Sequence, residues 1–179
     1  MKIKKLSNSN KLWLYKSIFY RNTLFESDDN NLDNIVKALN IKKRKDRIDF
    51  VYDTACDLID EYMKDKNVCD FKDGKCFVQR RNGSTSCDGC CGPIKCKHVT
   101  GKGCSTKNIS CKLFYCPSAR RKAKVLGVRN IDLLKVLSIR QRVICLINVT
   151  STREQILKDL YSYSFIYAIL RIFIRDCIK

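Results

Sequence analysis

The residues from Cys87 to Cys116, CDGCCGPIKCKHVTGKGCSTKNISCKLFYC, organise the rest of the chain. Seven of the twelve cysteines fall within these thirty residues, with the spacing C-x2-C-C-x4-C-x7-C-x6-C-x4-C. Thiolates crowded together repel one another and are costly to bury unless a metal ion or an iron-sulfur cluster neutralises them. The pattern therefore predicts a metal or cluster site.

The predicted metal ligands are the seven cysteines of this stretch: Cys87, Cys90, Cys91, Cys96, Cys104, Cys111 and Cys116. Further candidates are Cys69 and Cys76, just upstream, and His98, the only histidine of the chain. Only Cys87 and Cys90 have the C-x2-C spacing of a zinc knuckle, and four ligands satisfy one zinc ion or one cubane cluster. Zinc and an iron-sulfur cluster are thus both open as the cofactor, and the spare cysteines serve a second metal or are simply buried.

Part of this region resembles a known family. The order Cys87-Asp88-Gly89-Cys90-Cys91, Cys96, Gly103-Cys104-Ser105 and Cys111-Lys112-Leu113-Phe114 is similar to that of the YkgJ-type cysteine-cluster family, described as zinc- or iron-chelating domains. The resemblance covers residues 76–116 only. This chain has Ser84 where the family usually has another cysteine, and Asn108-Ile109-Ser110 where the family usually has an Arg-Pro pair before the later cysteine. The resemblance implies metal chelation and no defined activity.

Positive charge is concentrated in the same part of the chain. The net charge is +18, and residues 66–124 hold 14 Lys or Arg against 3 acidic residues. Such an excess favours an anionic partner, although a biased genome composition is an alternative source of it. Within the run from Ser118 to Lys124, the predicted nucleic-acid contacts are Arg120, Arg121, Lys122 and Lys124, with a plain solvated surface as the alternative.

Apolar periodicity predicts helices over residues 10–26, 32–39 and 46–64. The third combines an apolar stripe with acidic residues at four-residue steps on its other side, namely Asp49, Asp53, Asp57 and Glu61. We expect these carboxylates either to face solvent or to contact the basic cysteine-rich region. Cys56, on the apolar side of this helix, is expected to be a small core residue.

Residues 67–80 predict a β-hairpin about Asp73-Gly74, which places Cys69, Phe71, Cys76 and Val78 on one face of a two-stranded ribbon. In this register Cys69 faces Val78 and Lys72 faces Lys75. Cys69 and Cys76 then either lean toward the other cysteines or pack as small apolar groups.

The last third of the chain predicts helices. Residues 131–148 form one long or two short helices with these side chains inward: Leu133, Leu134, Leu137, Val143, Ile144 and Leu146. The sequence Ser151-Thr152-Arg153-Glu154 predicts a capping box at the start of a helix that runs to about Asp176. Residues 165–174 are apolar almost all round, but Arg171 interrupts them and they are too few to span a membrane. We expect a buried helix, or a surface for a protein partner where its apolar face is left open.

Together these patterns predict a mainly α protein with a small β-hairpin (α+β), in which a helical domain carries an irregular cysteine-rich metal-binding insert. Residues 1–66, 67–124 and 125–179 form its three parts within one compact unit. The basic N-terminus lacks the apolar core of a secretory signal, so a cytoplasmic, reducing location is expected. No Ser-His-acid set or phosphate-binding glycine loop is present, so no catalytic residue and no small-molecule substrate is predicted, and enzymatic activity is left open.

The function predicted is that of a metal-binding protein with a structural or redox-sensing centre. The alternative is a nucleic-acid-binding protein whose metal site folds a basic surface. An enzyme or maturation factor with a redox cluster is the third possibility.

Overall fold

The structure is a computed structural model of the whole chain and describes residues 2–9, 23–73, 75–83, 99–100, 103–122, 124–149 and 151–177. The described part is mainly helical and contains two small two-stranded sheets. The predicted α+β class is thus confirmed. The centre of the predicted insert, residues 84–98, lies outside the described residues.

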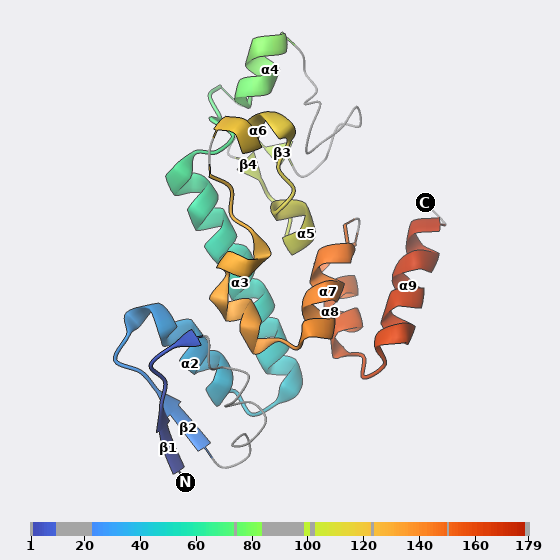
Figure 1. Cartoon of the computed structure of the whole chain (residues 1–179). Coiled ribbons are helices and arrows are strands. Elements are labelled where there is room, and N and C mark those ends of the chain that lie inside the picture. Colours follow the sequence, from blue (N-terminus) through green and yellow to red (C-terminus); the bar gives the residue numbers. More distant parts are fainter. Residues whose placement is uncertain are drawn as a thin grey trace.

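The helices are arranged around α3 (Arg44–Lys66), which runs along the length of the molecule (Figure 1). The other α-helices are α2 (Asp33–Asn40), α4 (Phe77–Asn82), α5 (Ile109–Lys112), α6 (Pro117–Lys122), α7 (Ile139–Ile147), α8 (Arg153–Tyr161) and α9 (Phe165–Cys177). Short 3-10 turns span Asn30–Leu32, Val128–Asn130 and Asp132–Val136. The helices predicted over residues 32–39 and 46–64 are confirmed as α2 and α3.

Strand β2 (Thr23–Glu26) pairs in parallel with β1 (Lys2–Lys5). The helix predicted over residues 10–26 is therefore wrong for residues 23–26, and residues 10–22 lie outside the described part. Thr23 and Phe25 are buried whereas Glu26 is exposed, which is the alternation of a strand. The Asn40 side chain holds the strand to α2, because it bonds both the amide and the carbonyl of Phe25 at 2.9 Å.

The main core forms where the apolar stripe of α3 packs against α2, α5, the Asp132–Val136 turn and α8, and α7 packs against α5 and α8. Cys56 is completely buried in it, as predicted. The predicted inward positions Leu133, Leu134, Leu137 and Ile144 are confirmed by their burial. Val143 and Leu146 are exposed, so these two predictions are wrong; between them, Cys145 takes the inward position on α7.

The hairpin predicted at residues 67–80 is reduced to a single antiparallel bridge. Lys72 and Lys75 face each other with backbone bonds of 3.0 and 2.9 Å, as predicted. The ribbon then ends, because Cys76 begins α4 and its amide donates to the Gln79 side chain at 2.9 Å. The predicted pairing of Cys69 with Val78 is wrong, since residue 77 donates to the Cys69 carbonyl and Val78 lies in the helix. The strands β3 (Val99–Thr100) and β4 (Gly103–Cys104) form a second two-stranded sheet, which is antiparallel. No strands were predicted at these residues.

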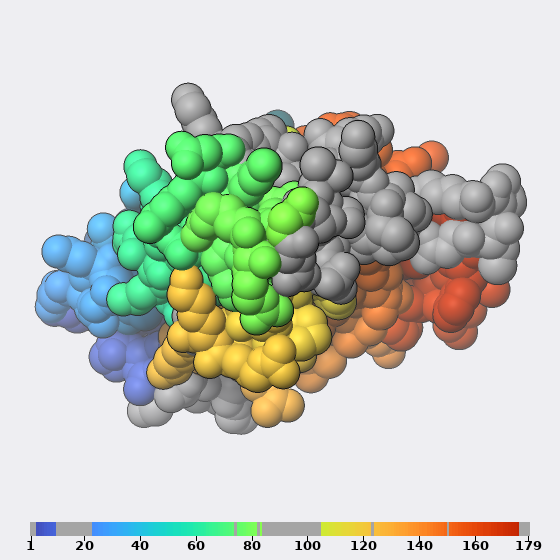
Figure 2. Space-filling view, turned by 90° about the horizontal axis from the view of Figure 1, so that it is seen from above, coloured from blue at the N-terminus to red at the C-terminus, as the bar shows by residue number. Residues whose placement is uncertain are grey.

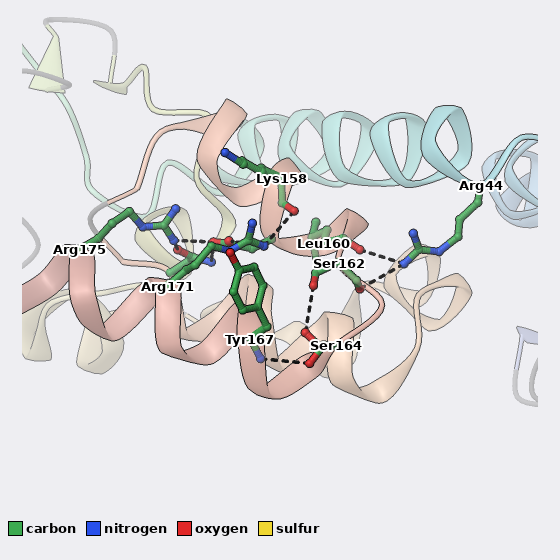
Figure 3. Close-up of polar contacts among 10 residues, drawn as sticks. Arg44, Lys158, Leu160, Ser162, Ser164, Tyr167, Arg171 and Arg175 are labelled. Carbon is green, nitrogen blue, oxygen red and sulfur yellow. Dashed lines mark hydrogen bonds and ion pairs between the residues drawn. The ribbon is translucent and has the colours of Figure 1, made fainter.

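The C-terminal helix predicted from residue 151 to about 176 is two helices, α8 and α9. Helix α8 is capped by Thr152, whose amide donates to the Gln155 side chain at 2.9 Å, one residue beyond the predicted cap. Helix α8 ends where the Arg44 guanidinium donates to the Tyr161 carbonyl at 2.7 Å and to the Leu160 carbonyl at 3.2 Å (Figure 3). Among the described helices, none combines the length and the apolar character needed to cross a membrane.

Candidate metal centre and basic face

Helix α3 positions the cysteine-rich segment through two tyrosines. The Tyr52 hydroxyl donates to the carbonyl of Lys107 at 3.1 Å, before α5. The Tyr62 hydroxyl donates to the carbonyl of Lys124 at 2.8 Å, after α6. The stretch that contains Cys111 and Cys116 is thus fixed to α3 at both of its ends.

The acidic side of α3 meets basic side chains from three later segments. Asp57 pairs with Lys107, and Asp60 pairs with the buried ammonium of Lys112. The predicted contact with the basic cysteine-rich region is thereby confirmed at Asp57. Asp53 instead forms two bonds, of 2.7 and 2.6 Å, with Arg153 of α8, and this carboxylate raises the pKa of the guanidinium above its usual value.

Asn108 connects this segment to the loop between α7 and α8. It is almost completely buried, and its side-chain oxygen caps α5 by accepting from the Cys111 amide at 3.0 Å. Its amide group donates to the carbonyls of Asn148 at 2.6 Å and Ser151 at 3.0 Å. The position of Cys111 is therefore set by the main body of the protein.

A second apolar cluster lies beyond the C-terminal end of α3. Its buried members, which we call the cysteine-end cluster, are Val68, Cys76, Val78, Tyr115, Cys116 and Ala119. Cys69 packs at its edge. Burial raises the pKa of Tyr115 to about 12, and the Cys69 thiol is close enough to add to that rise. The structure thus brings Cys69, Cys76 and Cys116 into one place from two separate parts of the sequence.

Two of these cysteines occupy equivalent positions in a repeated unit. The sequences Cys76-Phe-Val-Gln-Arg80-Arg81 and Cys116-Pro-Ser-Ala-Arg120-Arg121 share the pattern C-x3-R-R, and a six-residue helix follows each cysteine. In both units the cysteine sulfur accepts the amide of the third helical residue, at 3.3 Å in the second unit. This repeat was not predicted, although the pattern C-x3-R-R is visible in the sequence.

The described donor set fits part of a metal site. Hydrogen bonds to the ligating sulfurs are a feature of iron-sulfur centres, where they help to set the reduction potential. Within the ranges that the structure describes, however, no three histidine, cysteine or acidic side chains come together as a metal site requires. Cys76 and Cys116 can therefore supply only a share of the ligands.

The other predicted ligands are distributed as follows. Cys111 is partly buried on α5, and Cys104 lies in β4. Cys87, Cys90, Cys91, Cys96 and His98 lie outside the described residues. Cys56 and Cys145 are buried in the main core, where burial raises the pKa of each thiol to about 12, so both are kept in the unreactive thiol form.

The same end of the molecule carries a basic face made by α4, by the turn before α4, and by α6 with the residue Lys124 that follows it. Its side chains, which define the basic face, are Lys72, Lys75, Arg80, Arg81, Arg120, Arg121, Lys122 and Lys124. The two helices are joined through Asp70, which accepts from Arg80 at 2.8 Å and from Lys122 at 3.1 Å. Figure 2 looks onto this end, where the green residues of α4 lie beside the gold residues of α6.

All four predicted nucleic-acid contacts, Arg120, Arg121, Lys122 and Lys124, are exposed on this face. Lys122 also stacks over the Phe77 ring at 4.7 Å, which ties it to α4. Arg80 and Arg81 extend the basic face to the first C-x3-R-R unit. Neither was among the predicted nucleic-acid contacts.

Comparisons with protein-family models, with curated proteins and with solved structures find no match to this chain. The resemblance to the YkgJ-type cysteine-cluster family accordingly stays a prediction from the sequence.

Proposed function

We propose that this chain is a metal-binding protein in which Cys76 and Cys116 are two ligands of a zinc or iron-sulfur centre. The remaining ligands come from the other predicted cysteines, above all Cys87, Cys90, Cys91 and Cys96. The centre has a structural or redox-sensing role.

The observation that carries this proposal is the pair of C-x3-R-R units. Both sulfurs are buried in the cysteine-end cluster and both accept a backbone amide. The other predicted metal ligands of the dense cysteine run lie between Cys76 and Cys116 in the sequence. The two thiols thus stand at either end of the segment that is proposed to supply the remaining ligands. The resemblance to the cysteine-cluster family adds support from a separate direction.

Metal analysis of two matched double variants tests the proposal. Protein is purified without oxygen, and its iron, zinc and acid-labile sulfide are measured together with its absorption spectrum. The Cys76→Ala/Cys116→Ala variant is compared with Cys56→Ala/Cys145→Ala, which removes two cysteines from the main core instead. We expect the first variant to lose metal and the second to keep it.

Equal metal content in both variants would exclude Cys76 and Cys116 as ligands. Replacement of Cys90 and Cys91 by Ser is expected to lower the metal content in the same way. Brown protein with sulfide would identify an iron-sulfur centre and favour redox sensing, whereas colourless protein with stoichiometric zinc would favour a structural role.

Nucleic-acid binding is a second candidate function, favoured by the basic face. The two C-x3-R-R units place four arginines on two helices that are joined through Asp70. Phosphate contacts by Arg and Lys release counterions, so such binding weakens steeply as salt is added.

A charge-matched pair of variants tests this second function on RNA and DNA. Arg81→Glu/Arg121→Glu changes the basic face, and Arg129→Glu/Arg140→Glu makes the same change at exposed sites elsewhere. We expect the first variant alone to weaken binding and to flatten its salt dependence. Equal effects of the two variants, or no binding by the wild type at low salt, would end this candidate.

A cytoplasmic location is part of the proposal, because a reducing compartment keeps the thiols available to the metal. The open apolar face of α9 supports the predicted contact with a protein partner through the C-terminal helix.

A further inference from the structure

Helix α9 exposes most of its apolar side chains. Among the described side chains of this helix, only Ala168 and Ile172 are buried against the main core, so of the two predicted alternatives the structure shows the one in which the apolar face of the helix is left open. The outward stripe consists of Ile166, Tyr167, Leu170, Phe173 and Ile174, and Tyr163 precedes it in the turn. These six side chains are between 53% and 89% exposed. Their spacing of three, four, seven and eight residues aligns them along one side of the helix.

Both arginines described on α9 are bound by α8. Arg175 bonds the completely buried carboxylate of Asp159 in α8, and Arg171 approaches the other oxygen of that carboxylate at 3.1 Å. Arg171 also donates to the carbonyl of Lys158 at 3.2 Å, and the Tyr167 ring covers its guanidinium at 4.8 Å (Figure 3). The members of the stripe are themselves uncharged, and the Arg44 guanidinium covers the Tyr163 ring at 4.5 Å as Arg171 covers Tyr167.

The two arginines beside the stripe bear on its occupant. A polyanion or an anionic lipid surface is recognised through free Lys and Arg beside the apolar residues. Here Arg171 is paired with Asp159, and Arg44 donates to the Leu160 and Tyr161 carbonyls. Both guanidinium groups are thus already bonded within the protein, which favours an apolar partner over an anionic one.

The size of the stripe also suits a second copy. Its side chains expose on the order of 800 Å² of surface, which is about what each partner contributes to a standard-size interface. A two-fold axis pairs identical patches, so one apolar stripe is sufficient for both partners. We propose that the outward stripe of α9 is the interface of a homodimer, in which two α9 helices pack against each other about a two-fold axis.

The oligomeric state of the full chain tests this proposal. Light scattering after size exclusion is run under reducing conditions, so that disulfides between the many cysteines do not link copies. We expect a dimer at about 50 µM for the wild type, as for an interface of this size. Leu170→Glu/Phe173→Glu is expected to weaken the dimer about 100-fold or more, because it places charge in the centre of the apolar contact.

Ile3→Glu is the control, because Ile3 is equally exposed at the other end of the molecule and should leave the dimer intact (Figure 1). A monomeric wild type, or a dimer that both variants leave unchanged, would overturn the proposal. Sedimentation of a monomer with phosphatidylserine vesicles that depends on Leu170 and Phe173 would overturn it in favour of a lipid surface. The dimer does not depend on the metal centre, so Cys76→Ala/Cys116→Ala is expected to remain dimeric.

Discussion

The buried carboxylate of Asp159 offers the sharpest test of how the C-terminal helices are held together. Asp159 is completely buried and pairs with both Arg171 and Arg175, whose side chains are 23% and 20% exposed. The Asn148 side chain adds a hydrogen bond to the carboxylate at 3.3 Å. Asp159→Asn keeps the shape of the side chain but leaves two guanidinium groups without their counter-charge.

Removing one partner of a buried ion pair costs about 3–5 kcal/mol. The partial exposure of both arginines places Asp159→Asn near the lower end of that range, at about 3 kcal/mol. For a chain of this length, the corresponding loss in melting temperature is about 6–12 °C. Thermal and urea unfolding followed by circular dichroism measure both quantities.

Two comparisons make the test specific. Asp28→Asn removes an exposed ion pair with Lys5 and should cost less than about 1 kcal/mol. Combining Asp159→Leu with Arg171→Met and Arg175→Met should recover much of the loss, because no charge is then left buried alone. A melting temperature for Asp159→Asn within about 2 °C of the wild type would refute the reasoning.

Three further predictions concern the attachment of the cysteine-rich segment and the main core. Asn108→Ala should cost about 2–4 kcal/mol in urea unfolding, since α5 loses its cap and buried carbonyls lose their donor; a cost below about 1 kcal/mol would contradict this. Asp60→Asn should destabilise more than Lys112→Met, because only the first leaves a buried ammonium unpaired; the reverse order would argue against that pair. Burial raises the pKa of Cys56 and Cys145 to about 12, so their contribution to stability is complete below the usual thiol pKa of about 9 and is lost as the pH rises from there toward 12. The free energy of unfolding should therefore fall above about pH 9, by up to about 1.4 kcal/mol per pH unit for each thiol, and a flat profile up to pH 11 would contradict it.

Sequence periodicity was sufficient where an element is long and packs on one side. Helix α3 shows this best, because its apolar stripe repeats over many turns and every turn contacts the same core. Sequence periodicity failed where a residue far away in the sequence determines the local structure. Residues 23–26 are extended because they pair with β1 and are hydrogen-bonded by Asn40. Helix α8 ends at Tyr161, whose carbonyl accepts a hydrogen bond from Arg44 in another part of the chain.

The candidate site could be predicted only in part, for a similar reason. The cysteine density located the region, and the basic residues after Cys116 were identified correctly as exposed. Cys76 and Cys116 lie in one cluster because two short helices that are far apart in the sequence pack together there. Spacing within a single cysteine run does not contain that information, whereas the repeated C-x3-R-R pattern indicates that the two local units are alike.

Helix α3 belongs to two separate apolar cores, which gives the molecule an uneven stability along one helix. The buried residues of α3, which lie between Ile48 and Ile59, belong to the main core, whereas Tyr62 near its far end packs against the cysteine-end cluster. Amide groups between Ile48 and Ile59 are expected to exchange their hydrogens only when the main core opens, while those in the last turns need only a local opening. Fraying at this end would be gradual and reversible, so the cysteine-end cluster can loosen and re-form while the helical body stays folded.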